Sequence, residues 1–254
     1  MEFCVLLCTC KKYEFLVKPF LKLFNKYWPN NPSTIYINSD GIYNCDLPSN
    51  NIVVIDNSKC VSWSERLINS LNNIQEKYVL LVLDDFLFKG PVNQDEFYEI
   101  FNFQKTNNIK CIQFYPQNKL NKEMGLSNFY LRKRWAPYRI SAQICMYEKS
   151  YLLKILRKKE NPWEFELCGS FRSSLLYGGK IICAKRNGNY VFDTDIGFLI
   201  VRGTYTEEIR KRFEVAENVH LPDLEKTTLS IKKSPCIIRK IKLCVKCILS
   251  IFRN

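Results

Sequence analysis

The sequence lacks the glycine-rich patterns that most often mark a nucleotide site. No strand-like run is followed by the GxxxxGK[ST] pattern of a P-loop, and the GxGxxG fingerprint of dinucleotide-binding domains is missing. The chain has one histidine, His220, which we expect at the surface. Its CxxC pair, Cys244 and Cys247, has no second pair nearby, so no zinc site is expected. These absences exclude P-loop NTPases and argue against dinucleotide-dependent enzymes.

Long apolar runs are missing too. No run approaches the roughly 20 residues that a membrane-spanning helix needs, and residues 1–4 have neither the cationic start nor the apolar core of a signal peptide. The 12 cysteines are scattered through apolar segments, where they behave as small buried hydrophobes. We therefore expect free thiols in a reducing cytosol. The content of 46% hydrophobic residues excludes a disordered chain.

Acidic residues are absent from the C-terminal end. Residues 226–254 contain eight basic residues and no acidic ones, so the first 225 residues carry only +5 of the net charge of +13. We therefore expect a large folded domain over residues 1–225 and a basic amphipathic tail over residues 226–254. Because the charge is concentrated in the tail rather than spread over the fold, a nucleic-acid partner is not expected.

What the sequence does contain is an alternation of strand and helix patterns. Short apolar runs alternate with segments whose apolar residues recur at helical spacing. The predicted strands are 3–8, 34–38, 51–56, 78–83, 110–114, 139–147 and 180–184, and the predicted helices are 17–27, 63–74, 94–103, 149–158 and 163–176. This order is typical of an α/β domain with a mostly parallel sheet and helices on both faces.

The segment Tyr78–Phe88 is the most informative one in the chain. An unbroken apolar run, Tyr78–Leu83, leads directly into Asp84 and Asp85. Such a run is typical of a strand buried on both faces of a parallel sheet, and α/β sheets bind ligands at the carboxyl ends of their strands. Two carboxylates there need compensation, for which a divalent cation carrying a diphosphate is well suited. The alternative is that the pair caps a helix or closes a turn.

Several short motifs of the sequence occur in the same order as in one known protein family. The chain resembles bacterial glycosyltransferases of the GT-A fold, of the kind encoded in capsule and cell-surface polysaccharide clusters. The resemblance covers roughly the first 210 residues, and the strict Asp-x-Asp triplet of the family is absent. The segments that carry it are Leu6–Tyr13, Ser62–Leu67, Leu83–Leu87, Asn161–Glu166 and Ile200–Gly203.

The resemblance implies a nucleotide-diphosphate sugar as donor and a glycan or polyprenyl-diphosphate-linked glycan as acceptor. It implies a Mn²⁺ or Mg²⁺ ion held by Asp85 and Asp84, with Asp85 favoured. It also implies a donor site that includes Thr9, Asp56 and Arg66. Arg132, Lys133 and Arg134 lie in a stretch rich in bases and aromatics, 131–139, and are further candidate cations for the diphosphate.

An inverting glycosyltransferase also needs a carboxylate that takes the proton from the acceptor hydroxyl. Glu164 and Glu166 lie beside the aromatic rings of Trp163 and Phe165. The resemblance favours Glu166 as this base, with Glu164 second. The alternative is that Asn161 and the following proline begin a helix whose first-turn acids complement its dipole. Ser62 and Glu65 form a helix capping box and need no catalytic role.

The tail has the pattern of a helix that lies in a membrane interface. Arg239, Lys242, Lys246, Ser250 and Arg253 fall on one stripe of a helix, and apolar residues cover the rest. We therefore expect residues 235–254 to bind an anionic membrane surface and hold a cytoplasmic enzyme on the inner face of the membrane. A C-terminal helix packed on its own domain is the alternative. For the whole chain, a GT-A-like nucleotidyltransferase and a non-catalytic membrane-surface module also stay open.

Overall fold

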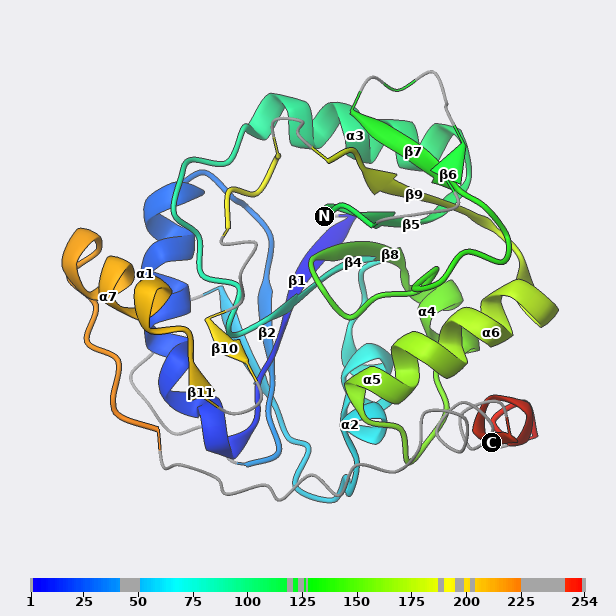
Figure 1. Cartoon of the computed structure of the whole chain (residues 1–254), viewed down its shortest axis with the longest axis horizontal. Coiled ribbons are helices and arrows are strands. Elements are labelled where there is room, and N and C mark those ends of the chain that lie inside the picture. Colours follow the sequence, from blue (N-terminus) through cyan, green and yellow to red (C-terminus); the bar gives the residue numbers. More distant parts are fainter. Residues whose placement is uncertain are drawn as a thin grey trace.

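A central sheet organises the chain (Figure 1). The computed structural model describes residues 2–41, 51–117, 121–122, 126, 128–186, 190–194, 199–201, 204–224 and 245–252. In these residues nine strands form one sheet of order β3-β2-β1-β4-β8-β5-β9-β7-β6, and two more form a separate ribbon. The strands are β1 (Phe3–Cys8), β2 (Ile35–Asn38), β3 (Ile52–Ile55), β4 (Tyr78–Leu83), β5 (Ile109–Gln113), β6 (Asn121–Lys122), β7 (Phe129–Arg132), β8 (Cys145–Glu148), β9 (Lys180–Ala184), β10 (Ile200–Val201) and β11 (Thr204–Tyr205).

The sheet is mostly parallel, as the sequence predicted. Strands β3, β2, β1 and β4 run parallel to one another, and β5 runs parallel to β9. Strand β8 is the exception in the centre, because it pairs antiparallel with both β4 and β5. The antiparallel strand β7 lies beyond β9 and pairs with β6. Helices cover both faces, which confirms the expected α/β class.

The helices form two layers, one on each face of the sheet. They are η1 (Lys11–Leu16), α1 (Val17–Tyr27), α2 (Trp63–Asn73), α3 (Gln94–Thr106), α4 (Lys149–Ile155), α5 (Pro162–Glu164), η2 (Phe165–Gly169), α6 (Ser170–Arg172), η3 (Ser173–Tyr177) and α7 (Glu207–Ala216). Elements α5 to η3 form one continuous helical segment, 162–177, with two π-helical stretches. Alternate residues of β1 serve the two layers: Val5 packs in the core with α1 and α3, and Leu6 packs in the core with α2, α4 and η2.

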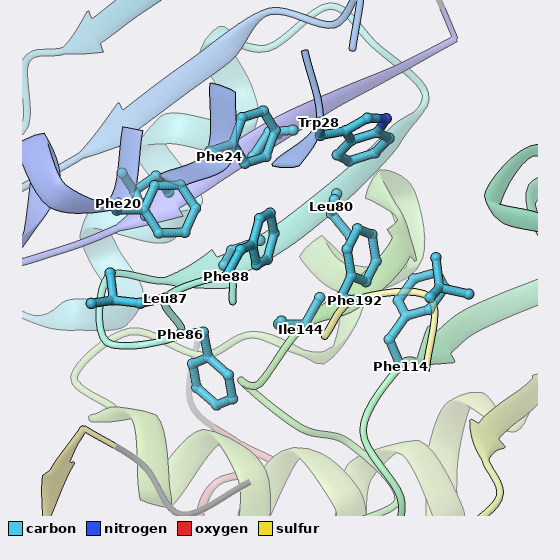
Figure 2. Packing of buried hydrophobic residues seen from close by; sticks show 14 of the residues in the cluster. Phe20, Phe24, Trp28, Leu80, Phe86, Leu87, Phe88, Phe114, Ile144 and Phe192 are labelled. Carbon is cyan, nitrogen blue, oxygen red and sulfur yellow. The ribbon is translucent and has the colours of Figure 1, made fainter. Parts of the chain in front are cut away.

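The chain that follows the acidic pair at the end of β4 is anchored in the first of these cores. Phe86, Leu87 and Phe88 are all buried. Figure 2 shows Phe88 between Phe24 and Phe192, whose ring centroids lie 5.5 Å and 5.6 Å from its own. Burial of a side chain of this size contributes roughly 1.5–3 kcal/mol. The backbone at the end of β4 therefore has little freedom to move.

Most predicted elements are present, and one differs. The bounds of β1, α1 and β4 are those predicted, and the capping box of α2 between Ser62 and Glu65 is formed. The predicted strand 139–147 is wrong over most of its length, because only Cys145–Glu148 pairs in the sheet. The preceding residues bond to the helical segment 162–177 instead: the Ile140 N–H donates to Ser170 Oγ at 2.9 Å.

Replacement of Phe88 tests this anchoring. Phe88→Ala should lower the free energy of unfolding by about 3–5 kcal/mol, because it leaves a cavity between two packed rings. Urea denaturation measures the loss. The matched control is Phe252→Ala, whose side chain is 79% exposed and whose removal should change stability by less than about 0.5 kcal/mol. Similar losses for the two variants would contradict the anchoring.

Candidate functional site

Several polar side chains gather at the carboxyl edge of the parallel strands. Strands β1 and β4 are neighbours in register, with Cys8 paired to Leu83, so the residues that follow them emerge side by side. Thr9 Oγ1 donates a hydrogen bond to Asp84 Oδ2 at 2.5 Å, and the Asp84 N–H donates to the Cys8 carbonyl at 3.2 Å. The structure thus brings together Thr9 and Asp84, which are 75 positions apart.

The two carboxylates of Asp84 and Asp85 are poorly solvated. Burial raises the pKa of Asp84 well above its ordinary value, and the neighbouring Asp85 raises it further, although the hydrogen bond from Thr9 lowers it. Burial also raises the pKa of Asp85, to about 6. At neutral pH the ionised pair is therefore costly for the folded protein unless a cation lies beside it.

A divalent cation fits this pair. The Asp85 Oδ1 atom is buried and has no hydrogen-bond partner among the described residues. Carboxylate oxygens are the ligands that Mg²⁺ and Mn²⁺ prefer. No cluster of three or more His, Cys, Asp or Glu side chains suited to a metal occurs in the described part of the chain. A cation held by Asp84 and Asp85 would therefore complete its coordination with oxygens of a ligand or of water.

Arg66 supplies a cation at the same edge. It lies in the first turns of α2 and is buried, and its Nη1 is 3.8 Å from Oδ2 of Asp40, which follows β2. Its Nε atom is buried without a hydrogen-bond partner in the described residues. Asp40 also accepts a hydrogen bond from the Lys11 N–H at 2.5 Å. A guanidinium whose donors are incompletely used suits an anionic ligand such as a diphosphate.

Asp56 lies at the same edge but is exposed. It follows β3, and its Oδ1 accepts a hydrogen bond from the Ser58 N–H at 2.9 Å. Hydrogen bonds from Ser58 lower the pKa of Asp56.

Glu166 is held in a defined position from two directions. Its Oε1 accepts hydrogen bonds from Ser141 Oγ and from the Ala142 N–H, both at 2.9 Å. Burial raises the pKa of Glu166, while these two hydrogen bonds lower it. Glu166 lies in the π-helical stretch η2, and such stretches are frequent at functional sites. A fixed carboxylate with a raised pKa has the properties of a general base.

The register of β8 places Glu166 at the same edge as the acidic pair. Strand β8 runs antiparallel to β4, and Cys145 pairs with Leu81. The residues just before β8, which include Ser141 and Ala142, therefore extend beyond the carboxyl end of β4. Since Glu166 is bound to both, three carboxylates converge on one edge of the sheet.

Glu164 has other partners. It forms a capping box with Asn161: the Glu164 N–H donates to Asn161 Oδ1 at 2.9 Å, and Glu164 Oε2 accepts from the Asn161 N–H at 3.3 Å. Its Oε1 forms an ion pair with Lys246 of the C-terminal segment. These contacts favour Glu166 over Glu164 as a base, because the carboxylate of Glu164 is already used at the helix start.

Sequence reasoning missed two contributors to the site. Asp40 and Ser141 have no recognisable motif, and only the spatial partners Arg66 and Glu166 reveal them. Of the three candidate cations, Arg132 is buried and bonds to a backbone carbonyl, whereas Lys133 and Arg134 are exposed. Arg134 bonds to the Ser174 carbonyl. His220 is exposed, as expected. Arg202 and Gly203, which carried part of the resemblance, lie outside the described residues.

Comparison with known proteins supports the fold. No protein-family model matches the sequence, and neither does any curated protein. Crystal structures of S. aureus TarS match this structure with a TM-score of 0.50 at 13% identity: residues 1–349 over 75% of this chain and 59% of that chain, and a longer TarS over 75% and 36%. The chain has a GT-A-like fold. It spans less than two thirds of the TarS chains that it matches.

One further structure is less similar. Glucosyl-3-phosphoglycerate synthase from Mycobacterium tuberculosis, in complex with Mn²⁺ and UDP-glucose, aligns with a TM-score of 0.44 at 12% identity. The alignment covers 74% of this chain and 72% of that chain.

Replacement of Asp85 tests the cation site. In wild-type protein, millimolar Mn²⁺ together with a nucleoside diphosphate should raise the melting temperature more than the nucleotide alone, because a ligand that binds only the folded state stabilises it. Asp85→Asn should abolish the part that depends on Mn²⁺. Without metal at pH 7.5, Asp85→Asn should be at least as stable as wild type. The pKa of Asp85 is about 6 in the folded protein and about 4 when unfolded, so the wild type loses folding free energy as pH rises through this range. Asparagine does not ionise and avoids this loss.

Asp95→Asn is the matched control, because Asp95 is an exposed acid in the first turn of α3. It should keep the full response to Mn²⁺. An undiminished response in Asp85→Asn would show that the pair does not hold the cation.

Proposed function

We propose that this chain is a glycosyltransferase that moves a sugar from a nucleotide-diphosphate donor to a glycan or polyprenyl-diphosphate-linked acceptor. The observation that carries the proposal is the convergence of a desolvated acidic pair, Asp84 and Asp85, with the separately held carboxylate of Glu166 on one edge of a GT-A-like sheet. The pair and the base supply the two functions that the reaction needs: neutralisation of a diphosphate and removal of a proton.

The donor side is formed by residues at the ends of β1, β3 and β4. Arg66 offers a guanidinium to the diphosphate, and Thr9 orients the Asp84 carboxylate through its hydrogen bond. Asp84 and Asp85 would hold Mn²⁺ or Mg²⁺, which when bound stabilises the negative charge of the leaving diphosphate. Asp56 is proposed to contact the nucleoside, since it lies at the same edge but farther along the sheet.

Glu166 acts on the acceptor. Its raised pKa makes it a better proton acceptor than an ordinary glutamate, and Ser141 and Ala142 bind one of its oxygens, which leaves the other to accept the proton. The acceptor oxygen then forms a bond to the anomeric carbon while the bond from that carbon to the diphosphate breaks. The proton passes to Glu166 and the electron pair leaves with the diphosphate, so the configuration inverts.

Replacement of Glu166 tests this assignment. Glu166→Gln keeps the size of the side chain but cannot accept a proton, so release of nucleoside diphosphate from the donor should slow by roughly two to four orders of magnitude. Donor binding, measured as the shift in melting temperature, should stay within about twofold. Water serves as acceptor in this assay, so the natural acceptor is not needed. If Glu164→Gln slows this release and Glu166→Gln does not, Glu164 is the base instead.

We also propose that the C-terminal segment attaches the enzyme to the inner face of an anionic membrane. Residues 245–249 are helical and pack on α5 and η2: Lys246 pairs with Glu164, and Cys247 Sγ lies 3.4 Å from Cys168 Sγ. Ser250 is buried. This part of the predicted cationic stripe thus faces the domain, and the rest of the stripe, at positions 239, 242 and 253, lies outside the described residues.

The opposite side of this segment is apolar and exposed. Val245, Ile248 and Leu249 are about half exposed and Phe252 more so. None of the helices in the described ranges is long and apolar enough to cross a bilayer. Lys158 and Lys159 are exposed and precede α5, on which the segment packs. Apolar side chains that point outward beside cations suit insertion into an anionic lipid surface.

Charged substitutions on the outward side test the attachment. The double variant Ile248→Asp with Phe252→Asp should weaken binding to vesicles of phosphatidylglycerol and phosphatidylcholine by at least about tenfold, because it removes inserted apolar groups and adds negative charge. Co-sedimentation measures this. Val215→Asp, on the exposed face of α7, is the control and should bind as wild type does. Wild-type protein that fails to sediment with the vesicles would overturn the proposal.

A further inference from the structure

The loop between β7 and β8 is rigidly held by arginines that point inward. Arg139 is buried and donates to the carbonyls of Arg132, Lys133 and Gly179 at 2.9, 3.0 and 2.5 Å. Arg134 Nε donates to the Ser174 carbonyl at 2.6 Å. These bonds tie the loop to itself and to η3. They restrain the backbone of the loop.

Two aromatic side chains point outward from this fixed loop. Trp135 is 58% exposed and Tyr138 is 46% exposed, and Leu175, next to the Ser174 anchor, is 41% exposed. Trp135 and Tyr138 are three positions apart in one loop, and exposed apolar groups that form a contiguous patch generally mark an interaction site. Aromatic rings held by a rigid backbone lose little entropy when a ligand covers them.

The backbone of Tyr138 is strained. Its φ is 50°, a left-handed conformation that glycine adopts freely and a bulky residue rarely does. Glycine would relieve the strain at this position, yet the chain has a tyrosine. Strained non-glycine residues cluster at ligand-binding sites, where the side chain has a role that offsets the cost. The role of Tyr138 therefore lies in its aromatic ring rather than in its backbone conformation.

The same loop leads directly to the candidate base. Tyr138 is three residues before Ser141, whose hydroxyl holds Glu166. Three residues span at most about 11 Å, so the Cα atoms of Tyr138 and Ser141 lie within that distance. Ile140, between them, is fixed by its hydrogen bond to Ser170. A chain of a few sugars that places a hydroxyl at Glu166 would thus extend over the neighbourhood of Tyr138.

We infer that Trp135 and Tyr138 form an aromatic platform that binds the acceptor glycan beyond the sugar that reacts. The apolar C–H faces of pyranose rings stack on indole and phenol rings. The guanidinium groups of Arg132, Arg134 and Arg139 bond to backbone carbonyls, so the outward-facing rings are the groups that contact the sugar rings. This inference rests on the proposed function, since it assigns the acceptor side of the same site.

Binding to an array of bacterial surface oligosaccharides tests the platform with the full chain. Wild-type protein should bind at least one group of glycans. Trp135→Ala and Tyr138→Gly should each weaken that binding about fivefold to tenfold, whereas Tyr138→Phe should keep it. Tyr138→Gly should melt at the same temperature as wild type or higher, because glycine fits the left-handed backbone. Val215→Ala, an exposed apolar position on α7, is the control and should bind normally.

Donor binding separates failure of this inference from failure of the proposed function. The shift in melting temperature caused by nucleotide sugar and Mn²⁺ should be the same in Trp135→Ala, Tyr138→Gly and wild type. If wild type shows that shift but binds no glycan, or if both variants bind glycans as tightly as wild type, the platform is wrong and the proposed function stands. If wild type shows no shift with any nucleotide sugar, the proposed function itself fails.

Discussion

Burial of the aromatic segment after β4 is the interaction on which the candidate site depends. Phe86, Leu87 and Phe88 are each worth roughly 1.5–3 kcal/mol when buried. Raising the pKa of Asp85 from 3.8 to about 6 costs less than their sum, since one pKa unit corresponds to about 1.4 kcal/mol. The hydrophobic core can therefore hold the Asp85 carboxylate in a poorly solvated position. A bound cation would offset the free-energy cost of ionising the carboxylates of Asp84 and Asp85, so the site favours cation binding.

The antiparallel strand β8 has an equally specific consequence. In a fully parallel sheet, the residues before a strand lie at the opposite edge from the residues that follow its neighbours. Because β8 runs against β4 and β5, the segment before it reaches the edge where Asp84 and Asp85 lie. That segment carries Ser141 and Ala142, which hold Glu166, and Tyr138. The reversed direction of β8 thus places the proposed acceptor residues at the same edge as the proposed donor residues.

Sequence patterns predicted the parts of this arrangement that depend on local chemistry. The apolar run Tyr78–Leu83 coincides with the bounds of β4, and the capping box Ser62–Glu65 marks the start of α2. The segment 139–147 was predicted as a strand, but Ile140 and Ser141 bond to a helix that is far away in sequence.

The same distinction applies to the site residues. Asp84 and Asp85 were recognisable because they follow a buried strand. The preference for Glu166 over Glu164 came from resemblance, whereas the structure supplies physical reasons: Glu164 is paired with Asn161 and Lys246, and Glu166 is held by a distant loop. Such partners arise from packing between segments, and no local pattern encodes them.

The most direct test of the account is the fate of a nucleotide sugar incubated with the protein and Mn²⁺, followed by phosphorus NMR. UDP-, GDP-, CDP- and dTDP-sugars are offered in turn, beside the corresponding nucleoside triphosphates with sugar 1-phosphates. The account predicts that one nucleotide sugar is converted to nucleoside diphosphate and that Glu166→Gln stops the conversion. Release of pyrophosphate from a triphosphate, with every nucleotide sugar left intact, would contradict it and indicate a nucleotidyltransferase.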